Sequence, residues 1–216
     1  MTNPAQGPHQ GWPVERRGEP LETARAAMIM LHGRGATAHD ILSLVDEIHT
    51  EGFAYLAPQA AGYTWYPYSF LAPIDQNEPG LSSGLAVIDE LVAEIEAAGI
   101  SAERTMILGF SQGACLTLEY TARHARRYGG IVGLTGGLIG PQSTPRDYAG
   151  SLDSTPIFVA SSDPDPHIPV ARVKETVIVL DGMGAQVEAR LYPNMGHTIN
   201  TDEIAYVRDL MATLVK

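Results

Sequence analysis

Short apolar runs alternate with longer segments of helical period along most of the chain. The runs predict strands near Ala26–Leu31, Phe53–Ala57, Thr105–Leu108, Gly130–Leu134, Pro156–Ala160 and Gln186–Tyr192. The segments between them predict helices over Ala38–Thr50, Ser82–Ala98, Gln112–Tyr128, Val170–Gly182 and Thr201–Val215. Alternation of strand and helix is typical of βαβ units. The pattern therefore predicts an α/β fold with a mostly parallel sheet and helices on both faces.

The segment Ser82–Ala98 has the clearest helical period. Its apolar residues recur at spacings of three and four and form one stripe, while the acidic residues lie mostly away from it. Gly99 follows directly and suits a left-handed helix cap. The apolar residues of the stripe are Leu85, Ile88, Leu91, Val92 and Ile95.

Residues 62–80 form a loop that does not fit the alternation. Five aromatic residues fall between positions 63 and 70, with neither strand nor helix period: Tyr63, Trp65, Tyr66, Tyr68 and Phe70. A polar connector would not have this composition. The loop either packs on its own domain or forms a wall or partial lid for an apolar substrate near the active site, and both can hold together.

Length and charge narrow the class of protein. A chain of 216 residues suits one domain over 1–216, with 1–13 as a flexible N-terminal segment. The net charge of -11 argues against a nucleic-acid partner. No apolar run is long enough for a membrane span, and the N-terminus lacks the features of a secretory signal, so a cytoplasmic location is expected. The single cysteine, Cys115, fits a reducing compartment.

The stretch Gly109-Phe110-Ser111-Gln112-Gly113 is the strongest candidate for chemistry. It places one serine between two glycines at the predicted junction of a strand and a helix. In such a tight turn the serine backbone is strained, and its neighbours must lack bulk. The turn holds the hydroxyl out as a nucleophile, so Ser111 is the candidate nucleophile.

A serine hydroxyl needs a base and a carboxylate that holds the base. Of seven histidines, His197 is favoured, because it follows the predicted strand Gln186–Tyr192 at a carboxyl strand end. The proline-rich loop after Pro156–Ala160 offers two carboxylates, Asp163 and Asp165, and the residues alone leave both open. The order serine, aspartate, histidine is that of the α/β-hydrolase arrangement.

The negative oxygen of a tetrahedral intermediate requires main-chain N–H donors. The amide of Gln112, directly after the nucleophile, is one candidate. The loop His32-Gly33-Arg34-Gly35 follows an early strand and offers the amide of Arg34 as the second. The alternative reading as a phosphate-binding loop is disfavoured, because the glycine spacing matches neither the dinucleotide fingerprint nor the P-loop.

These motifs together resemble the phospholipase/carboxylesterase family of α/β hydrolases, which includes bacterial carboxylesterases and acyl-protein thioesterases. In the loop Asp163-Pro164-Asp165-Pro166-His167-Ile168-Pro169, the resemblance makes Asp165 the catalytic carboxylate and gives Asp163 a supporting role. Thr64-Trp65-Tyr66 is similar to a tryptophan-containing loop near the family's substrate site. A homodimer is also plausible from the resemblance. Substrate contacts are expected from His32, Gly33, Trp65, Tyr66 and Phe70.

The sequence thus predicts a serine hydrolase that cleaves carboxylic esters or thioesters through an acyl-enzyme, of the carboxylesterase, lysophospholipase or acyl-thioesterase type. No metal or organic cofactor is expected, since no cysteine or histidine cluster has ligand spacing. A cysteine nucleophile, as in the related dienelactone hydrolases, is disfavoured because Cys115 lies one helical turn beyond the serine. Two alternatives stay open: a non-catalytic small-molecule-binding protein on the same scaffold, and a metal-dependent hydrolase.

Overall fold

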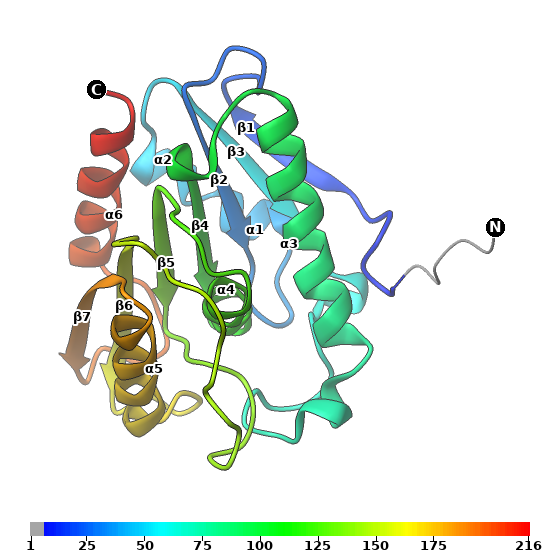
Figure 1. Cartoon of the computed structure of the whole chain (residues 1–216), viewed down its shortest axis with the longest axis vertical. Helices are drawn as coiled ribbons and strands as arrows, with labels where there is room; N and C mark the ends of the chain where they lie inside the picture. The colour runs from blue at the N-terminus through cyan, green and yellow to red at the C-terminus, as the bar shows by residue number, and fades with distance from the viewer. Residues whose placement is uncertain (1–6) are drawn as a thin grey trace.

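The computed structural model describes residues 7–216, which form one domain around a seven-stranded sheet (Figure 1). The strand order is β1-β3-β2-β4-β5-β6-β7, with β1 antiparallel and every other pair parallel. The predicted α/β fold with a mostly parallel sheet is confirmed. The strands are β1 Val14–Gly18, β2 Ala26–Leu31, β3 Phe53–Pro58, β4 Thr105–Phe110, β5 Gly130–Leu134, β6 Pro156–Asp163 and β7 Gln186–Pro193.

Helices cover both faces of the sheet, as expected (Figure 1). On one face, α3, α4 and α5 pack on the sheet in one apolar cluster. On the other, α1, α2 and α6 form a second cluster. The helices are α1 Ala38–Leu42, α2 Val45–Ile48, α3 Gly80–Ala97, α4 Gln112–Arg123, α5 Val170–Gly182 and α6 Thr201–Leu214, with short 3-10 turns at Ala61–Tyr63, Ile74–Asn77 and Ala102–Arg104.

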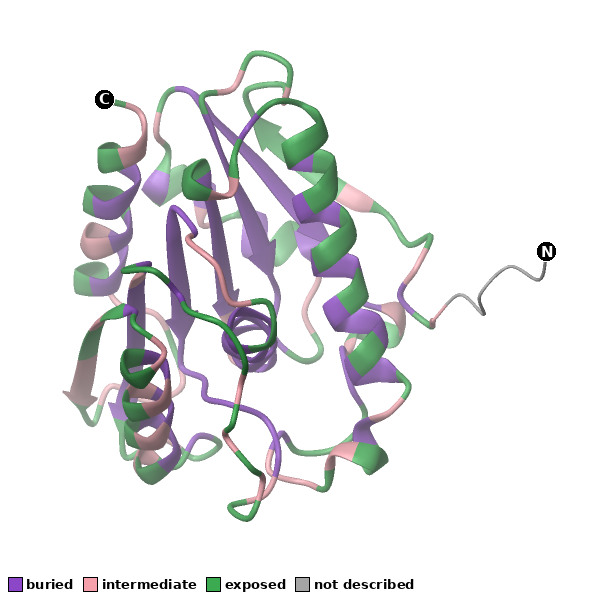
Figure 2. Ribbon diagram, viewed as in Figure 1, coloured by how far each residue is buried: buried purple, intermediate pink, exposed green. Residues whose placement is uncertain are grey.

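The central strands are apolar throughout because both of their faces are covered. In β2, Met28 and Met30 belong to the cluster under α6, whereas Ile29 and Leu31 belong to the cluster under α3 and α4. Side chains of a strand point alternately to opposite faces, so a doubly covered strand needs apolar residues at every position. Figure 2 shows the result as a buried centre of the sheet between helices whose outer faces are exposed.

The sequence pattern missed the edge strand β1. Its residues after Val14 are Glu15, Arg16 and Arg17, which have no apolar alternation. The strand is held instead by its antiparallel ladder to β3, and its charged side chains suit an exposed sheet edge. Backbone pairing of this kind leaves no signal in the hydrophobic pattern.

Two predicted helices are shorter than expected. The segment Ala38–Thr50 is divided into α1 and α2 at Ser43 and Leu44, whose backbone keeps helical angles, and it ends at Ile48 because His49 leaves the helical conformation. Helix α4 ends at Arg123 rather than near Tyr128. The Tyr128 amide donates to the Thr155 hydroxyl at 3.0 Å, so a contact with a distant loop turns the chain into β5.

Within the N-terminal segment predicted for 1–13, His9 packs on the domain, residues 11–13 are exposed, and the flexibility of the segment stays a prediction. His9 is buried, and its ring bonds the Trp65 carbonyl at 2.8 Å and the Ala61 amide at 3.1 Å. Its own amide donates to the Ser83 hydroxyl at 2.9 Å. The remainder of the predicted segment, residues 1–6, lies outside the described residues.

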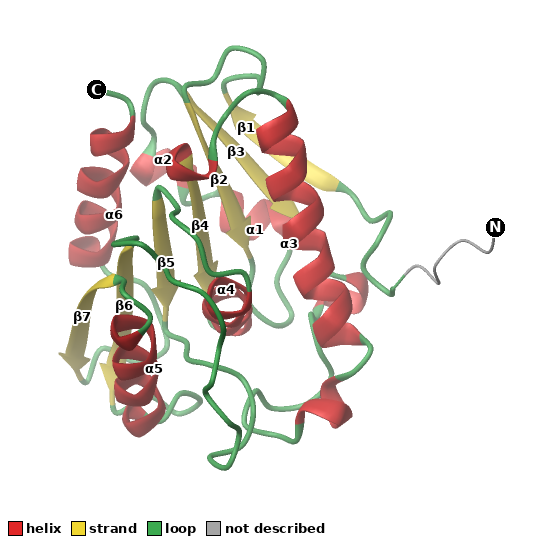
Figure 3. Cartoon of the chain, in the orientation of Figure 1, coloured by secondary structure: helices red, strands yellow, loops and turns green. Residues whose placement is uncertain are grey.

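Because β2 to β7 are parallel, the loops that follow them leave from the same end of the sheet. The loops after β2, β4, β6 and β7 all leave from carboxyl strand ends, where open α/β sheets gather working residues. Long loops also follow β3 and β5, as Figure 3 shows. Among residues 7–216, none of the helices has the length and apolar character needed to cross a bilayer.

Candidate active site

Ser111 occupies a strained turn between β4 and α4. Its backbone has φ 55° and ψ −116°, a conformation that residues other than glycine rarely adopt. The turn is held from both sides, because the Ser111 amide donates to the Leu134 carbonyl and the Ser111 carbonyl accepts from the Cys115 amide. Strain that is held in this way is characteristic of functional positions.

The two glycines of the motif are required by close backbone approach. A Cβ at Gly109 would lie 2.2 Å from the Gly113 carbonyl oxygen, and a Cβ at Gly113 would lie 2.2 Å from the Leu31 carbonyl oxygen. Either contact is far shorter than atoms allow. The glycines therefore let α4 start directly against the ends of β4 and β2.

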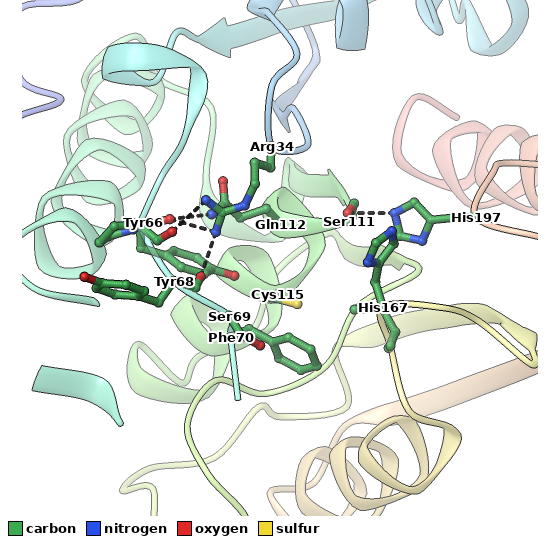
Figure 4. Close-up of a pocket in the computed structure, with 12 residues that line it drawn as sticks. Arg34, Tyr66, Tyr68, Ser69, Phe70, Ser111, Gln112, Cys115, His167 and His197 are labelled. Atoms are coloured by element: carbon green, nitrogen blue, oxygen red, sulfur yellow. Dashed lines mark hydrogen bonds between the residues drawn. The ribbon is translucent and has the colours of Figure 1, made fainter. Parts of the chain in front are cut away.

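The structure brings Ser111, His197 and Asp165 into one hydrogen-bonded row. His197 Nε2 lies 2.8 Å from Ser111 Oγ, and His197 Nδ1 lies 2.9 Å from Asp165 Oδ2 (Figure 4 shows the first contact). With its hydrogen on Nδ1, the imidazole donates to Asp165 and accepts the serine hydroxyl. This arrangement can remove a proton from the serine.

The Asp165 carboxylate is prepared as an anion. Burial by itself would raise the pKa of Asp165, but the amides of His167 and Ile168 together with the His197 ring outweigh it and hold the pKa below its usual value. Both amides donate to Oδ1, at 2.8 and 2.9 Å. Oδ2 is thereby left free for the imidazole. The other carboxylate of this loop, Asp163, is exposed at the end of β6.

Two main-chain amides beside Ser111 are available as donors. Gln112 is the first residue of α4, where helix amides have no intrahelical acceptor. Arg34 lies in the loop after β2, which packs against the turn at Ser111: a Cβ at Gly33 would lie 3.4 Å from the Ser111 Cβ. Within residues 7–216, neither amide donates a hydrogen bond to another group of the chain. Both are the donors that the sequence predicts for an oxyanion.

A cavity of about 450 Å³ opens beside Ser111 and His197 (Figure 4). One wall comes from the aromatic loop, which lies over α4, and the opposite side comes from the loop after β6. The lining residues are Arg34, Tyr66, Pro67, Tyr68, Ser69, Phe70, Ser111, Gln112, Cys115, His167, Ile168 and His197.

Comparison with known proteins identifies the family of this fold and site. The family model described as Phospholipase/Carboxylesterase matches residues 18–215. The chain belongs to the phospholipase/carboxylesterase family. The resemblance inferred from the motifs is therefore confirmed, and the family indicates a hydrolase.

Relatives of this family member include acyl-protein thioesterases. Acyl-protein thioesterase 1 of Gibberella zeae is 26% identical over 203 residues, which cover 83% of this chain and 86% of the relative. Acyl-protein thioesterase 1 of Saccharomyces cerevisiae is 28% identical over 207 residues, covering 85% and 90%. The crystal structure of a phospholipase/carboxylesterase from Dyadobacter fermentans superimposes with a TM-score of 0.90 at 50% identity, covering 95% of this chain and 97% of that chain.

Of the five residues expected to contact substrate, Tyr66 and Phe70 line the cavity and three do not. Trp65 is fully buried behind the wall and donates its indole N–H to the His32 carbonyl at 2.9 Å. His32 is also buried, accepts the Ala60 amide at 3.1 Å, and has its pKa lowered by burial. Gly33 lies against Ser111. In place of the expected direct contact, the structure gives His32 and Trp65 a supporting position behind the wall.

His167 and Cys115 also line the cavity, a position that the sequence motifs did not indicate. His167 faces the His197 ring, with ring centroids 4.8 Å apart, and it belongs to the same loop as Asp165. Cys115 lies one helical turn after Ser111, a spacing visible in the sequence. Burial raises the pKa of Cys115 to about 12, so the thiol stays protonated and is a poor nucleophile.

Glu203 supports the loop that carries His197. It lies in the first turn of α6, and its Oε2 accepts the Asn200 amide at 2.7 Å. The carboxyl is buried, and its Oε1 has no hydrogen-bond partner within residues 7–216. Burial raises the pKa of Glu203 to about 7.

Glu203→Gln should therefore remove a pH dependence of stability. The folded protein holds the Glu203 proton up to about pH 7, whereas the unfolded chain releases it near its ordinary value of 4.5. The stabilisation is present below pH 4.5 and is lost as the pH rises through 7, by about 2 kcal/mol between pH 5 and 8. Urea unfolding of both proteins at these pH values measures it. Equal losses in both proteins would contradict this role for Glu203.

Proposed function

We propose that this chain is a serine hydrolase that cleaves carboxylic esters or thioesters through an acyl-enzyme on Ser111. The observation that carries the proposal is the contact of His197 Nε2 with Ser111 Oγ at 2.8 Å, with Asp165 on the other ring nitrogen. A serine becomes a nucleophile when a base so placed accepts its proton.

In the acylation step, Ser111 Oγ attacks the carbonyl carbon of the ester or thioester while its proton moves to His197 Nε2. The carbonyl oxygen becomes an oxyanion, which the main-chain amides of Arg34 and Gln112 stabilise. Asp165 holds the imidazole and stabilises its positive charge. The bond to the leaving alcohol or thiol then breaks, and that group receives the proton from His197.

In the deacylation step, water replaces the leaving group. His197 takes a proton from the water, whose oxygen attacks the acyl carbon. The same two amides bind the second oxyanion, and its collapse releases the carboxylic acid and returns the proton to Ser111 Oγ. The cycle uses only groups of this chain and water.

The proposed substrates have a carboxylesterase, lysophospholipase or acyl-thioesterase character. The names of the relatives, acyl-protein thioesterase and phospholipase/carboxylesterase, support this range. The rings of Tyr66 and Phe70 on the cavity wall give an acyl chain an apolar surface. The cytoplasmic location and the homodimer expected from the sequence stay predictions.

Labelling with a fluorophosphonate tests the proposal. Only an activated serine reacts, so the label should attach to the peptide that contains Ser111, and nitrophenyl ester hydrolysis should be lost in proportion to the label. Mass spectrometry and residual activity measure the two quantities. A chelator should leave hydrolysis unaffected.

The other outcomes identify the alternatives. A protein that binds ligand but neither labels nor hydrolyses a series of nitrophenyl esters or a thioester would be a non-catalytic binding protein. Loss of activity with a chelator, together with absence of labelling, would indicate a metal-dependent hydrolase. Either result would contradict the proposed mechanism.

A further inference from the structure

The Arg34 side chain is bound to the aromatic loop and to no carboxylate among the described residues. Its guanidinium donates to three successive carbonyls, those of Tyr66 at 2.9 Å, Pro67 at 2.9 Å and Tyr68 at 2.7 Å. The ion pairs found within residues 7–216 do not include Arg34. Within residues 7–216, the hydrogen bonds that this guanidinium donates therefore all go to one short stretch of backbone.

The Gln112 side chain holds the same stretch of backbone. Its Oε1 accepts from the Trp65 amide at 2.9 Å and from the Thr64 hydroxyl at 3.2 Å, and its Nε2 donates to the Tyr66 carbonyl at 2.8 Å. The side chain is buried, so losing these bonds would leave backbone polar groups without partners. Figure 4 shows the Arg34 and Gln112 side chains meeting at Tyr66.

Residues 64–68, here called the wall segment, begin at the cap of a 3-10 turn, where the Thr64 amide donates to the Ala61 carbonyl, and residues 65–68 belong to no strand or helix. They lie between the 3-10 turns Ala61–Tyr63 and Ile74–Asn77, and Tyr66, Pro67 and Tyr68 line the cavity. The Tyr66 carbonyl accepts from both Arg34 and Gln112. The position of Tyr66 in this side of the cavity therefore depends on two side chains from outside the loop, while the His9 ring holds the neighbouring Trp65 carbonyl and Asn77 accepts the Tyr68 amide.

We propose that the side chains of Arg34 and Gln112 are positioning groups that fix the wall segment, so the residues whose amides face the oxyanion also set the acyl preference of the cavity. The second half of this proposal, which concerns the acyl preference, rests on the proposed function. Both residues sit next to the reacting carbonyl through their backbones and reach the wall through their side chains. The acyl chain and the oxyanion are thus aligned by the same two residues. A planar guanidinium with several fixed donors can bond three carbonyls that converge on it, which a lysine ammonium would do less well.

Fluorescence tests the wall without reference to activity. The chain has two tryptophans, Trp12 and Trp65, and Trp12 is 46% exposed while Trp65 is fully buried within the wall segment. In a Trp12→Phe background, Arg34→Met should raise acrylamide quenching of Trp65 about twofold or more, because the wall segment opens locally. Gln112→Met should do the same, and Arg34→Lys should give an intermediate value.

Kinetics test the acyl preference. The ratio of kcat/KM for hexanoyl and acetyl nitrophenyl esters should change about fivefold or more in Arg34→Met, mainly through KM, because a displaced wall alters binding of the longer chain. Arg34→Lys should recover part of the change. The main-chain amide of residue 34 is kept in both variants.

Arg127→Met is the matched control. Arg127 also donates to main-chain carbonyls, those of Asp153 and Ser154, but it lies away from the cavity. Its substitution should change neither Trp65 quenching nor the ester ratio. If Arg34→Met shows quenching equal to this control, the proposal is overturned, and this holds even if the protein hydrolyses no ester. A uniform loss for both esters would place the guanidinium effect on the oxyanion and also overturn it.

Discussion

Changing Ser111 to alanine is expected to lower kcat for ester hydrolysis by about 10⁶-fold, because the members of such a triad act as a unit. The hydroxyl oxygen is the atom that forms the acyl bond, and it lies within hydrogen-bond distance of His197 Nε2 at 2.8 Å. Alanine leaves the base in place without a nucleophile. Initial rates with a nitrophenyl ester at saturating substrate, on protein freed of trace esterases, measure the loss.

The fold of this variant should be intact. The turn at residue 111 is held by main-chain bonds to Leu134 and Cys115, which alanine keeps. Its urea unfolding midpoint should therefore match that of the unchanged protein. Substantial hydrolysis by the well-folded variant would show that another group is the nucleophile and would reject the mechanism.

The hydrophobic pattern predicted the elements whose structure depends on burial. Strands β2, β5 and helix α5 have the predicted bounds, since their apolar positions match the faces that the sheet covers. Elements decided by distant polar contacts were missed or misjudged. β1 depends on pairing with β3, and the end of α4 depends on a bond from Tyr128 to Thr155. Neither contact has a periodic signature.

In the candidate site, too, local features could be predicted from the sequence and contacts between distant segments could not. Local motifs indicated Ser111, His197 and the two amide donors, and the structure places them together, although their catalytic roles stay predictions. The motif alone could not choose between Asp163 and Asp165, because the choice depends on how the loop folds. The motifs also gave no sign of the Arg34 side-chain contacts, which arise only when separate loops meet, or of the burial of Glu203, which depends on how α6 packs.

The second large effect on catalysis is expected from replacing Asp165, the carboxylate that contacts His197. Asp165→Asn should lower kcat by about 10⁴-fold, as a wrong imidazole tautomer does in a related triad. Oδ1 of residue 165 accepts two amides, from His167 and Ile168, and an asparagine oxygen would keep those bonds. Its NH₂ group would then face His197 Nδ1. That nitrogen would have to accept, which moves the ring hydrogen to Nε2, the atom that must receive the serine proton.

Asp163→Asn is the matched control, since it makes the same chemical change two residues earlier on an exposed side chain. Its main-chain carbonyl, which accepts the Asn194 amide, is retained. The variant should keep kcat within about threefold, because exposed substitutions away from the reacting atoms have small effects. A loss confined to Asp163→Asn would mean that the loop rearranges to present the other carboxylate. The rate of fluorophosphonate labelling provides a second measurement. In Asp165→Asn the imidazole cannot accept the Ser111 proton, so the labelling rate should fall by about the same factor as kcat.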